Sequence, residues 1–261
     1  MAYSKIKFER DGDVALITMN DPATLNAISA DMTAQMSEAF AIAAQEARCV
    51  VLTGEGRGFS SGALLTGAPP IGEDGQIDPG LHLERSYNPF VTMLRDLPIP
   101  FVTAVNGAAA GIGCSFALLG DIIVAAESAY FLQAFRRIGL VPDGGATYLL
   151  PRMLTRAQAM ETMLLGEKLP AAKALQWGLI NRCVPDAYLM PTALALAHEL
   201  AQGPTKALGL IRKLAWESAD SDFAGQLHAE RLAQRQAGRT ADFAEGVSAF
   251  AQKRPAEFKG V

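Results

Sequence analysis

The stretch GLVPDGGATYLLP, residues 139–151, holds a carboxylate in unusual surroundings. Asp143 lies between a proline and two glycines, a combination that turns favour. Apolar residues flank this turn-like segment on both sides: Ile138, Leu140, Val141, Tyr148, Leu149 and Leu150. They predict that the segment enters a core, where a carboxylate has a raised pKa and can accept and return a proton. Asp143 is therefore either a turn residue or an acid/base.

The sequence GFSSG, residues 58–62, matches the G-x-S-x-G pattern of hydrolase nucleophiles. That pattern requires a helix directly after the serine and a later Asp–His pair, whereas here a Gly/Pro-rich segment follows. Two of the three histidines, His198 and His228, lie in amphipathic helical stretches. We favour a turn whose backbone N–H groups face a ligand, for which small residues are well suited.

A second glycine-rich segment, GAAAGIG at residues 107–113, departs from the dinucleotide-binding pattern because Phe116 takes the place of the third glycine. A helix that begins here would expose amides suited to an anionic oxygen. Together with the turn at 62–64, it could offer two amides to a developing oxyanion. Close packing of a strand on a helix explains the same glycines equally well.

Other polar groups give weaker signals. No Cys/His spacing typical of a metal site occurs, so no metal is expected. Arg136 and Arg137 could bind phosphate or form a surface pair. Three acidic residues of the Gly/Pro-rich segment 66–80 are expected to be solvated: Glu73, Asp74 and Asp78. We expect this segment to be a mobile loop, either a gate over a substrate or an insertion, and a specificity loop could extend over 66–90.

The elements that must position these residues alternate between strand and helix, which predicts an α/β core. Asp11-Gly12-Asp13 predicts a hairpin between 5–9 and 14–19, and Ser29 predicts a helix N-cap. Further strands are expected at 50–53, 101–105, 122–126, 130–132 and 180–184. Helices are expected at 156–165, from Pro170 to Gly178, and at 189–201, 206–219, 223–236 and 241–252.

Composition sets the broad class. The chain has 261 residues, half of them hydrophobic, and a net charge of −4, so neither nucleic acid nor an anionic membrane is expected as a partner. Residues 97–120 carry no charge, but prolines and glycines interrupt them, so we interpret them as buried core. Cys49, Cys114 and Cys183 are expected to be reduced buried thiols, and the charged N-terminus is unlike a secretory signal; both features favour a cytoplasmic protein.

Four segments together resemble the crotonase, or enoyl-CoA hydratase/isomerase, superfamily: FSSGALL (59–65), AVNGAAAGIGCSFALLGDIIVAA (104–126), FLQAFRRIGLVPDGGATYLLPRML (131–154) and AAKALQWGLINRCV (171–184). The similarity covers nearly the whole chain. It implies an α/β spiral of ββα turns over residues 1–200, with the acyl-CoA site, and a helical region over 201–261 that builds trimers or dimers of trimers. Coenzyme A would enter as part of the substrate, with no other cofactor.

The resemblance also implies a substrate site. The thioester carbonyl would lie between the backbone amides of Ala63 and of Ile112 beside Gly111, and Asp143 would be the catalytic acid/base. Substrate-binding positions carried over from the resemblance are Ala27, Ser61, Leu64, Leu65, Tyr87, Phe135, Ile138 and Pro142. Leu64, Phe135 and Ile138 are expected to form apolar walls that keep water out.

The departures from the family pattern point to isomerisation. Family hydratases carry two glutamates where this chain has Ser115 and Phe135, and the usual aspartate of the first motif is Leu64. Certain enoyl-CoA isomerases of the superfamily place their single catalytic carboxylate on the loop that holds Asp143. The isomerases that act on a ring-epoxide CoA thioester have a similar GLxPD loop, and the 4-chlorobenzoyl-CoA dehalogenases have a nucleophilic aspartate at the same place. The segments ERSYNP (84–89) and DFAEGVSAFAQKR (242–254) also resemble those ring-epoxide isomerases.

We therefore expect an acyl-CoA isomerase that shifts a proton or opens a ring epoxide through an enolate. Three alternatives remain open at this point. They are a 2-enoyl-CoA hydratase, a dehalogenase of the 4-chlorobenzoyl-CoA type, and a non-catalytic protein that binds CoA thioesters.

Overall fold

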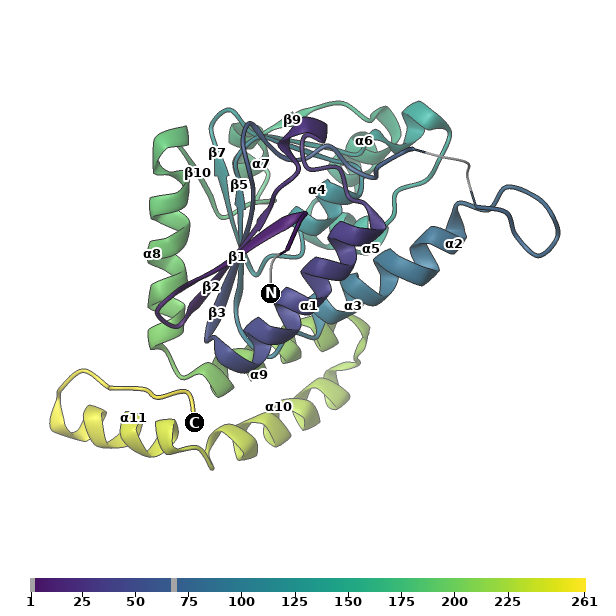
Figure 1. Cartoon of the computed structure of the whole chain (residues 1–261). Helices are drawn as coiled ribbons and strands as arrows, with labels where there is room; N and C mark the ends of the chain where they lie inside the picture. Colours follow the sequence, from purple (N-terminus) through teal and green to yellow (C-terminus); the bar gives the residue numbers. More distant parts are fainter. Residues whose placement is uncertain (1–2, 67–69) are drawn as a thin grey trace.

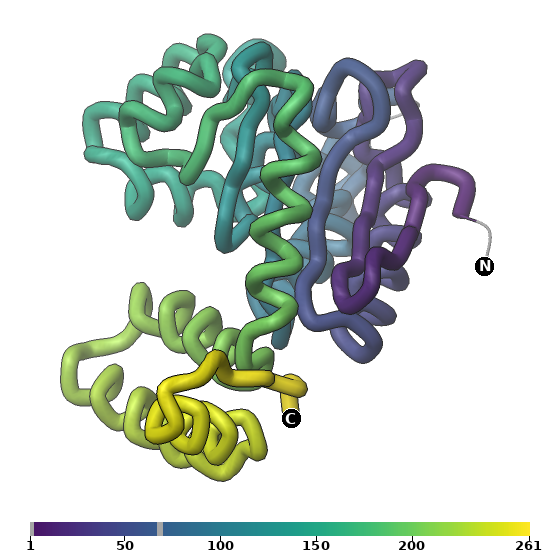
Figure 2. Tube along the Cα trace, turned by 90° about the vertical axis from the view of Figure 1, so that its left-hand side faces the viewer, coloured from purple at the N-terminus to yellow at the C-terminus, as the bar shows by residue number. Residues whose placement is uncertain are grey.

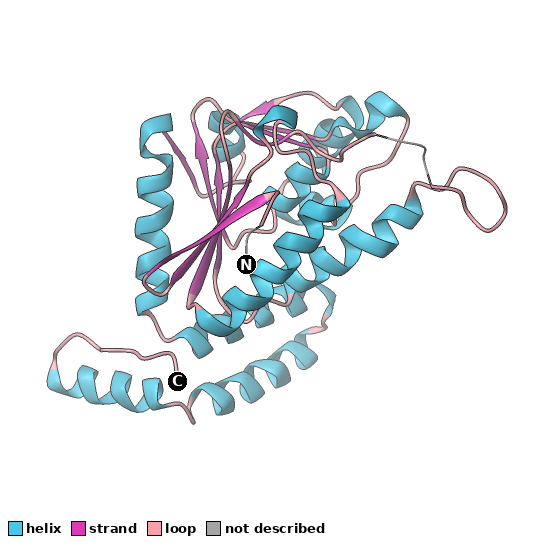
Figure 3. Ribbon diagram, in the orientation of Figure 1, coloured by secondary structure: helices cyan, strands magenta, loops and turns pink. Residues whose placement is uncertain are grey.

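The computed structural model of the chain describes residues 3–66 and 70–261, whose strands form two sheets. The larger has the order β1-β2-β3-β5-β7-β10 and the smaller β4-β6-β8-β9, both magenta in Figure 3. The bounds are β1 (Ile6–Asp11), β2 (Val14–Met19), β3 (Cys49–Gly54), β4 (Gly58–Ser60), β5 (Phe101–Val105), β6 (Ala108–Ala110), β7 (Ile122–Ala126), β8 (Tyr130–Leu132), β9 (Leu169–Pro170) and β10 (Arg182–Val184).

The chain winds between the two sheets as a spiral. Strands β3, β5 and β7 lie side by side and parallel in the larger sheet, and each is followed by a strand of the smaller sheet, β4, β6 or β8, also parallel to one another. The predicted hairpin at Asp11–Asp13 joins the antiparallel strands β1 and β2. The predicted α/β spiral of ββα turns is confirmed.

Helices enclose the larger sheet (Figure 1). Helix α8 packs on β3, β5 and β7, and α1 packs on the opposite face with α3 beside it. The helix bounds are α1 (Ala30–Glu46), α2 (Gly80–His82), α3 (Asn88–Arg95), α4 (Ile112–Ala117), α5 (Ala146–Met153), α6 (Arg156–Leu165), α7 (Ala171–Gln176), α8 (Leu189–Gln202), α9 (Thr205–Glu217), α10 (Phe223–Ala237) and α11 (Ala241–Gln252).

Local signals explain the best-predicted elements. The Ser29 side chain accepts a hydrogen bond from the Met32 amide and so caps α1, as expected. Phe40, from the predicted apolar face of α1, is fully buried and meets Phe90 and Phe101 edge to face, with ring centroids 5.8 and 5.3 Å apart. Helix α6 has the predicted bounds of 156 and 165.

The uncharged stretch 97–120 is core, as predicted. It forms β5, β6 and α4, and all six residues of α4 are buried. The glycine-rich segment at 107–113 contains a strand before the helix, because Ala108–Ala110 pairs with β4 and β8 as strand β6. In the described part of the chain no helix is both long and apolar enough to cross a membrane.

The specificity loop expected over 66–90 ends earlier than predicted. From Gly80 the chain is helical through α2, a π-helical turn over Leu83–Tyr87, and α3. The apolar spacing of Tyr87, Phe90 and Leu94 explains this, because one helical face buries all three side chains. Part of the expected loop, 67–69, lies outside the described residues.

The C-terminal helices leave the core. Helix α8 ends at Gln202, one residue after the predicted helix end at 201, and the domain boundary at 200 stays a prediction. Helices α10 and α11 extend below the sheets in Figure 1, and Figure 2 shows the same separation from the side. The C-terminal tail returns along α11, where the Asp242 carboxylate accepts hydrogen bonds from the amides of Lys259 (2.7 Å) and Gly260 (2.8 Å).

The three cysteines are free thiols. Burial raises the pKa of both Cys49 and Cys114 to about 12, so these thiols are inert at neutral pH. Cys183 is half-buried rather than buried, because its strand β10 lies at the edge of the larger sheet.

Candidate active site

Asp143 lies on the loop between a 3-10 turn at Ala134–Ile138 and α5. Its Oδ1 atom is buried and has no hydrogen-bond partner among the described residues. Burial raises the pKa of this carboxyl to about 7. The Asp143 backbone carbonyl, not its side chain, closes the turn by accepting from the Ala146 amide (3.1 Å). The loop is thus a turn whose carboxylate is left free for chemistry.

The first candidate oxyanion donor is the amide of Ala63, just after β4. Ala63 pairs with Ile28 in an isolated parallel bridge, in which Ile28 donates to the Gly62 carbonyl (2.7 Å) and Leu64 donates to the Ile28 carbonyl (2.9 Å). This pairing turns the Ala63 amide the other way, and within residues 3–66 and 70–261 that amide has no acceptor. Gly62 makes the turn possible because its φ is +102°.

The second candidate donor is the amide of Ile112, the first residue of α4. A first-turn amide has no partner inside its helix, and the described residues provide none outside it. The Gly111 amide, in contrast, donates to the Leu132 carbonyl at 2.9 Å, so this N–H is already committed. Gly111 contributes a backbone turn with φ of +52° rather than a donor.

Close backbone contacts hold the two turns together. A side chain added at Gly62 would lie 3.0 Å from the Ala110 carbonyl oxygen and 3.7 Å from the Gly111 Cα. The turns meet because β4 and β6, which precede them, are parallel neighbours in the smaller sheet. Their carboxyl ends therefore fall at the same edge, and the Ala63 turn lies beside the start of α4.

The Asp143 loop rests on the same helix. A side chain added at Gly144 would collide with the Ile112 side chain and lie 2.8 Å from the Ser115 Cβ. The Ser115 hydroxyl donates to the Asp143 carbonyl at 2.8 Å. The structure therefore brings together the predicted base and both predicted amide donors.

Aromatic side chains line this region. Tyr87 is buried, and its hydroxyl donates to the Ile28 carbonyl (3.2 Å). Burial first, and then the charge of Asp143, raise the pKa of Tyr87 to about 12. The Phe135 ring is also buried and lies 3.9 Å from where a side chain at Gly111 would begin. Leu64 and Pro142 are half-buried.

Some residues that were expected in the core or in the substrate site are exposed to solvent. Ile138, Leu140 and Val141 were expected in the core, but they are 55%, 41% and 77% exposed. The reason is that the 3-10 turn ends at Gly139 in the left-handed conformation and sends the chain across the surface. The expectation that Ile138 enters the core is therefore wrong, while its role as an apolar wall of the substrate site stays a prediction. Leu65 is also exposed, at 72%.

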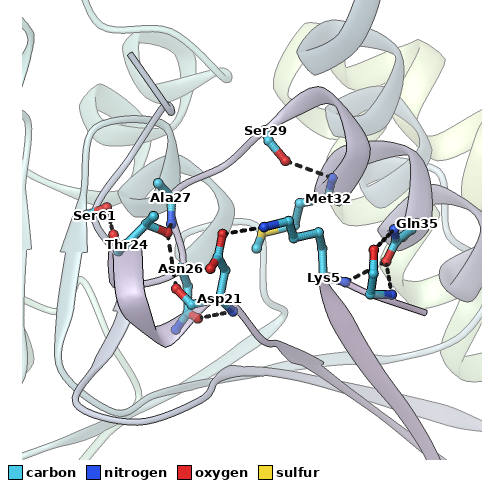
Figure 4. Close-up of polar contacts among 10 residues, drawn as sticks. Lys5, Asp21, Thr24, Asn26, Ala27, Ser29, Met32, Gln35 and Ser61 are labelled. Atoms are coloured by element: carbon cyan, nitrogen blue, oxygen red, sulfur yellow. Dashed lines mark hydrogen bonds and ion pairs between the residues drawn. The ribbon is translucent and has the colours of Figure 1, made fainter. Parts of the chain in front are cut away.

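The segment before α1 supports the Ala63 turn (Figure 4). Ala27 is buried, and its amide donates to the Thr24 hydroxyl (3.1 Å), while the Ser61 hydroxyl donates to the Thr24 carbonyl (2.7 Å). Asn26, which our sequence reasoning missed, is fully buried with a φ of +57°. Its side chain donates to the carbonyls of Glu55 and Gly58. An asparagine in a Pro-led turn was the available signal, because Asn tolerates positive φ.

Other candidate groups are occupied. The Ser60 hydroxyl is buried and donates to the Asn26 carbonyl (2.8 Å), which argues against a hydrolase nucleophile. Arg136 and Arg137 donate to the last carbonyls of α6 and to Gly166, so they cap a helix. Over the described ranges, no group of three or more His, Cys, Asp or Glu could hold a metal ion.

Comparisons with known proteins identify the family of the chain. The family model described as Enoyl-CoA hydratase/isomerase matches residues 9–261. A 1,2-epoxyphenylacetyl-CoA isomerase of Escherichia coli K12 is 44% identical over 95% of both chains. A Rhodobacter capsulatus protein named "Probable enoyl-CoA hydratase" is 41% identical over the whole of both.

Solved structures share the fold. A crystal structure of enoyl-CoA hydratase subunit I from Geobacillus kaustophilus has a TM-score of 0.91, with 31% identity over 99% of each chain. The family model, the sequence relatives and the solved structure all support the same family assignment. The chain belongs to the enoyl-CoA hydratase/isomerase family.

Proposed function

We propose that this protein is an acyl-CoA isomerase with Asp143 as its single acid/base. The thioester carbonyl would accept hydrogen bonds from the amides of Ala63 and Ile112. Asp143 would remove a proton alpha to the thioester, and the electron pair would delocalise into an enolate. Return of the same proton at the gamma carbon would complete a 1,3-shift without change of oxidation state. Coenzyme A enters with the substrate, and the reaction requires no further cofactor.

The observation that carries the proposal is the state of Asp143. Asp143 is half-buried, its buried Oδ1 has no partner among the described residues, and burial raises its pKa to about 7. A base with a pKa near the working pH combines a useful ionised fraction with useful proton affinity. The desolvation that raises the pKa also makes the carboxylate a stronger base than one in water.

Hydration is disfavoured by what occupies the two hydratase glutamate positions. Phe135 has no ionisable group, and the Ser115 hydroxyl already donates to the Asp143 carbonyl. Neither can activate a water molecule. A single carboxylate beside two amides suits proton shuttling on the substrate better than addition of water.

A ring-epoxide CoA thioester is the second candidate substrate. The supporting observation is the 44% identity to the 1,2-epoxyphenylacetyl-CoA isomerase of Escherichia coli. The same pair of amides would bind the thioester carbonyl, while a carbon–oxygen bond of the epoxide would break in place of a carbon–hydrogen bond.

Assembly is a further part of the proposal. We propose a homotrimer, or a dimer of trimers, formed through the C-terminal helices. Phe223 and Phe250 support this, because these large apolar side chains are 80% and 87% exposed in the single chain. Cytoplasmic localisation stays a prediction.

Proton exchange followed by NMR tests the proposal. Wild type, Asp143→Asn and Asp13→Asn are incubated in deuterated water with a 3-enoyl-CoA, and separately with a ring-epoxide CoA thioester. We expect turnover by wild type and a loss of about 10²–10⁴-fold in Asp143→Asn. Asp13, an exposed residue of the β1–β2 hairpin, provides the matched control and should behave as wild type.

Each outcome has a distinct meaning. Exchange at C2 and C4 of the 3-enoyl-CoA identifies an allylic isomerase, whereas turnover of the epoxide alone identifies the second substrate. Equal turnover by wild type and Asp143→Asn would refute the role of Asp143. Chloride release from an aryl-CoA, or hydration of a 2-enoyl-CoA at comparable rates, would refute the isomerase assignment.

A further inference from the structure

The direction in which the Asp143 carboxylate points depends on how the Asp143 main chain is held. A catalytic carboxylate is often oriented by hydrogen bonds to its own oxygens, but within the described residues Oδ1 accepts none. The direction of the side chain is therefore set by where the Asp143 main chain is held. Two donors hold the Asp143 carbonyl, the Ala146 amide at 3.1 Å and the Ser115 hydroxyl at 2.8 Å.

These two donors are unequal. Ala146 belongs to the same local turn and moves with it, because it lies three residues along the chain. Ser115 is fully buried in α4, 28 residues away, so its bond ties the loop to a fixed element of the core. Gly144 lets the loop approach, since a side chain there would collide with α4.

Helix α4 also begins with the second oxyanion donor. Ile112 and Ser115 are three residues apart, which places them on neighbouring positions of one helical face. The same short helix thus presents an amide to the thioester carbonyl and a hydroxyl to the base loop. A fixed distance between carbonyl and base determines which substrate carbon Asp143 can reach.

We propose that Ser115 is a positioning residue that fixes the spacing between the acid/base Asp143 and the oxyanion amide of Ile112. This inference rests on the proposed function. At this position the family hydratases have a catalytic glutamate, and here the side chain acts through the Asp143 main chain and does not touch the substrate. The residue therefore governs the rate of proton transfer rather than the binding of the thioester.

The test compares three variants under the NMR assay and by hydrogen exchange. Ser115→Ala removes the hydroxyl, Ser115→Cys retains a weak donor, and Thr103→Val is the matched control. Thr103 is also fully buried, and its hydroxyl donates to the main-chain carbonyl of Ala117 at 2.8 Å. Ala117 is the last residue of α4, so this bond holds the end of the helix opposite to Ile112. A general loosening of α4 should therefore appear in Thr103→Val as well.

We expect Ser115→Ala to lower kcat about 10- to 100-fold, because misplacement by about 1 Å can cost 10²-fold, with KM within about threefold of wild type. The kcat of Ser115→Cys should lie between those of wild type and Ser115→Ala. Peptides covering 142–150 should exchange amide hydrogens faster in Ser115→Ala than in wild type or Thr103→Val. Wild-type kcat in Ser115→Ala, or an equal loss of kcat in Thr103→Val, would overturn the proposal.

The exchange measurement separates this inference from the proposed function. If wild type turns over no isomerase substrate, the proposed function fails. Faster amide exchange over 142–150 in Ser115→Ala would then still support the positioning role of Ser115. Unchanged amide exchange over 142–150 in Ser115→Ala would overturn the positioning role of Ser115, whatever the activity.

Discussion

Helix α4 and the C-terminal helices bury their residues to opposite extents. All six residues of α4 are buried, whereas α10 buries none and α11 buries Asp242 and Ala249. The folded single chain buries every apolar side chain of α4. It leaves Phe223 and Phe250 exposed. The contrast teaches that the site can be explained from one chain, while the C-terminal helices have an apolar surface suited to a partner.

Two carboxylates show the same contrast in electrostatic terms. Burial raises the pKa of Asp143 to about 7. Hydrogen bonds from Arg254 and from the Glu257 amide lower the pKa of Glu245, on exposed α11, to about 2. The fold therefore opposes the charge of Asp143 and favours the charge of Glu245. Such opposition is typical of functional sites, where stability is given up for reactivity.

The largest predicted effect is a pH-dependent stabilisation by Asp143→Asn. Because the native pKa of about 7 exceeds the ordinary 3.8, the native state retains a proton that the unfolded state loses between these values. Wild type therefore loses stability relative to the variant as pH rises from about 4 to about 7. At pH 8 the variant should gain about 4 kcal/mol at most, and at pH 3.5 almost nothing.

Urea unfolding at both pH values measures this difference. Glu245→Gln serves as the comparison from the exposed region. Its native pKa is depressed, so its contribution is present at pH 8 and is lost as pH falls from about 4.5 toward about 2. Substitution of Glu245 should therefore not stabilise the protein at pH 8. A gain by Asp143→Asn that is equal at both pH values would contradict a buried charge at Asp143.

A second pair of variants compares one substitution in the two regions. In Gly113→Ala the new methyl group would lie 2.5 Å from the Ser60 Cβ, so we expect a loss of about 2–3 kcal/mol in the free energy of unfolding. In Gly246→Ala, on α11, the nearest atom is Cε1 of Phe258 at 3.4 Å. There the better helix propensity of alanine should give a gain of up to about 1 kcal/mol.

Gly113→Ala should also lower turnover, because Ser60 accepts from the Gly62 amide and so supports the Ala63 turn. Thermal and urea unfolding, together with the NMR assay, check both variants. If the two substitutions proved equally tolerated, the close approach of α4 to β4 would be disproved.

The smallest effect on the fold is expected from Phe250→Ser. This side chain is 87% exposed, so the free energy of unfolding of the chain itself should change by about 0.5 kcal/mol or less. Sedimentation should nevertheless show a smaller assembly, as proposed for a trimer contact. Tyr188→Ser, an exposed aromatic before α8, is the control. An unchanged mass for the double variant Phe223→Ser/Phe250→Ser would refute a role for this surface in assembly.

Elements with strong local signals could be predicted from the sequence. Ser29 begins α1 because its side chain caps the helix, and the glycine between Asp11 and Asp13 gives the hairpin its turn. The short strands β4 and β6 could not be recognised. Each has three residues, and its strand conformation depends on pairing with segments distant along the chain, about 50 residues apart for β4 and β6. Local pattern does not carry that information.

The candidate site divides in the same way. Asp143, Ala63 and Ile112 could be named because long motifs surround them. The engagement of the Gly111 amide by Leu132, and of Ser115 by Asp143, could not be read from the sequence, because each is a contact between segments distant along the chain. The exposure of Ile138 was mispredicted because its apolar neighbours suggested burial, while Gly139 redirects the chain.

The two free amides of the site have a genetic consequence. Since both donors are main-chain groups, a substitution at Ala63 or Ile112 changes the side chain but leaves the N–H in place. A gene library could thus vary the side chains at these two positions while both proposed oxyanion donors persist. Proline is the exception, because it has no N–H. At Ile112 a proline would occupy the first position of α4, where the lost N–H makes no hydrogen bond inside the helix, so a single codon change would remove one of the two proposed oxyanion donors.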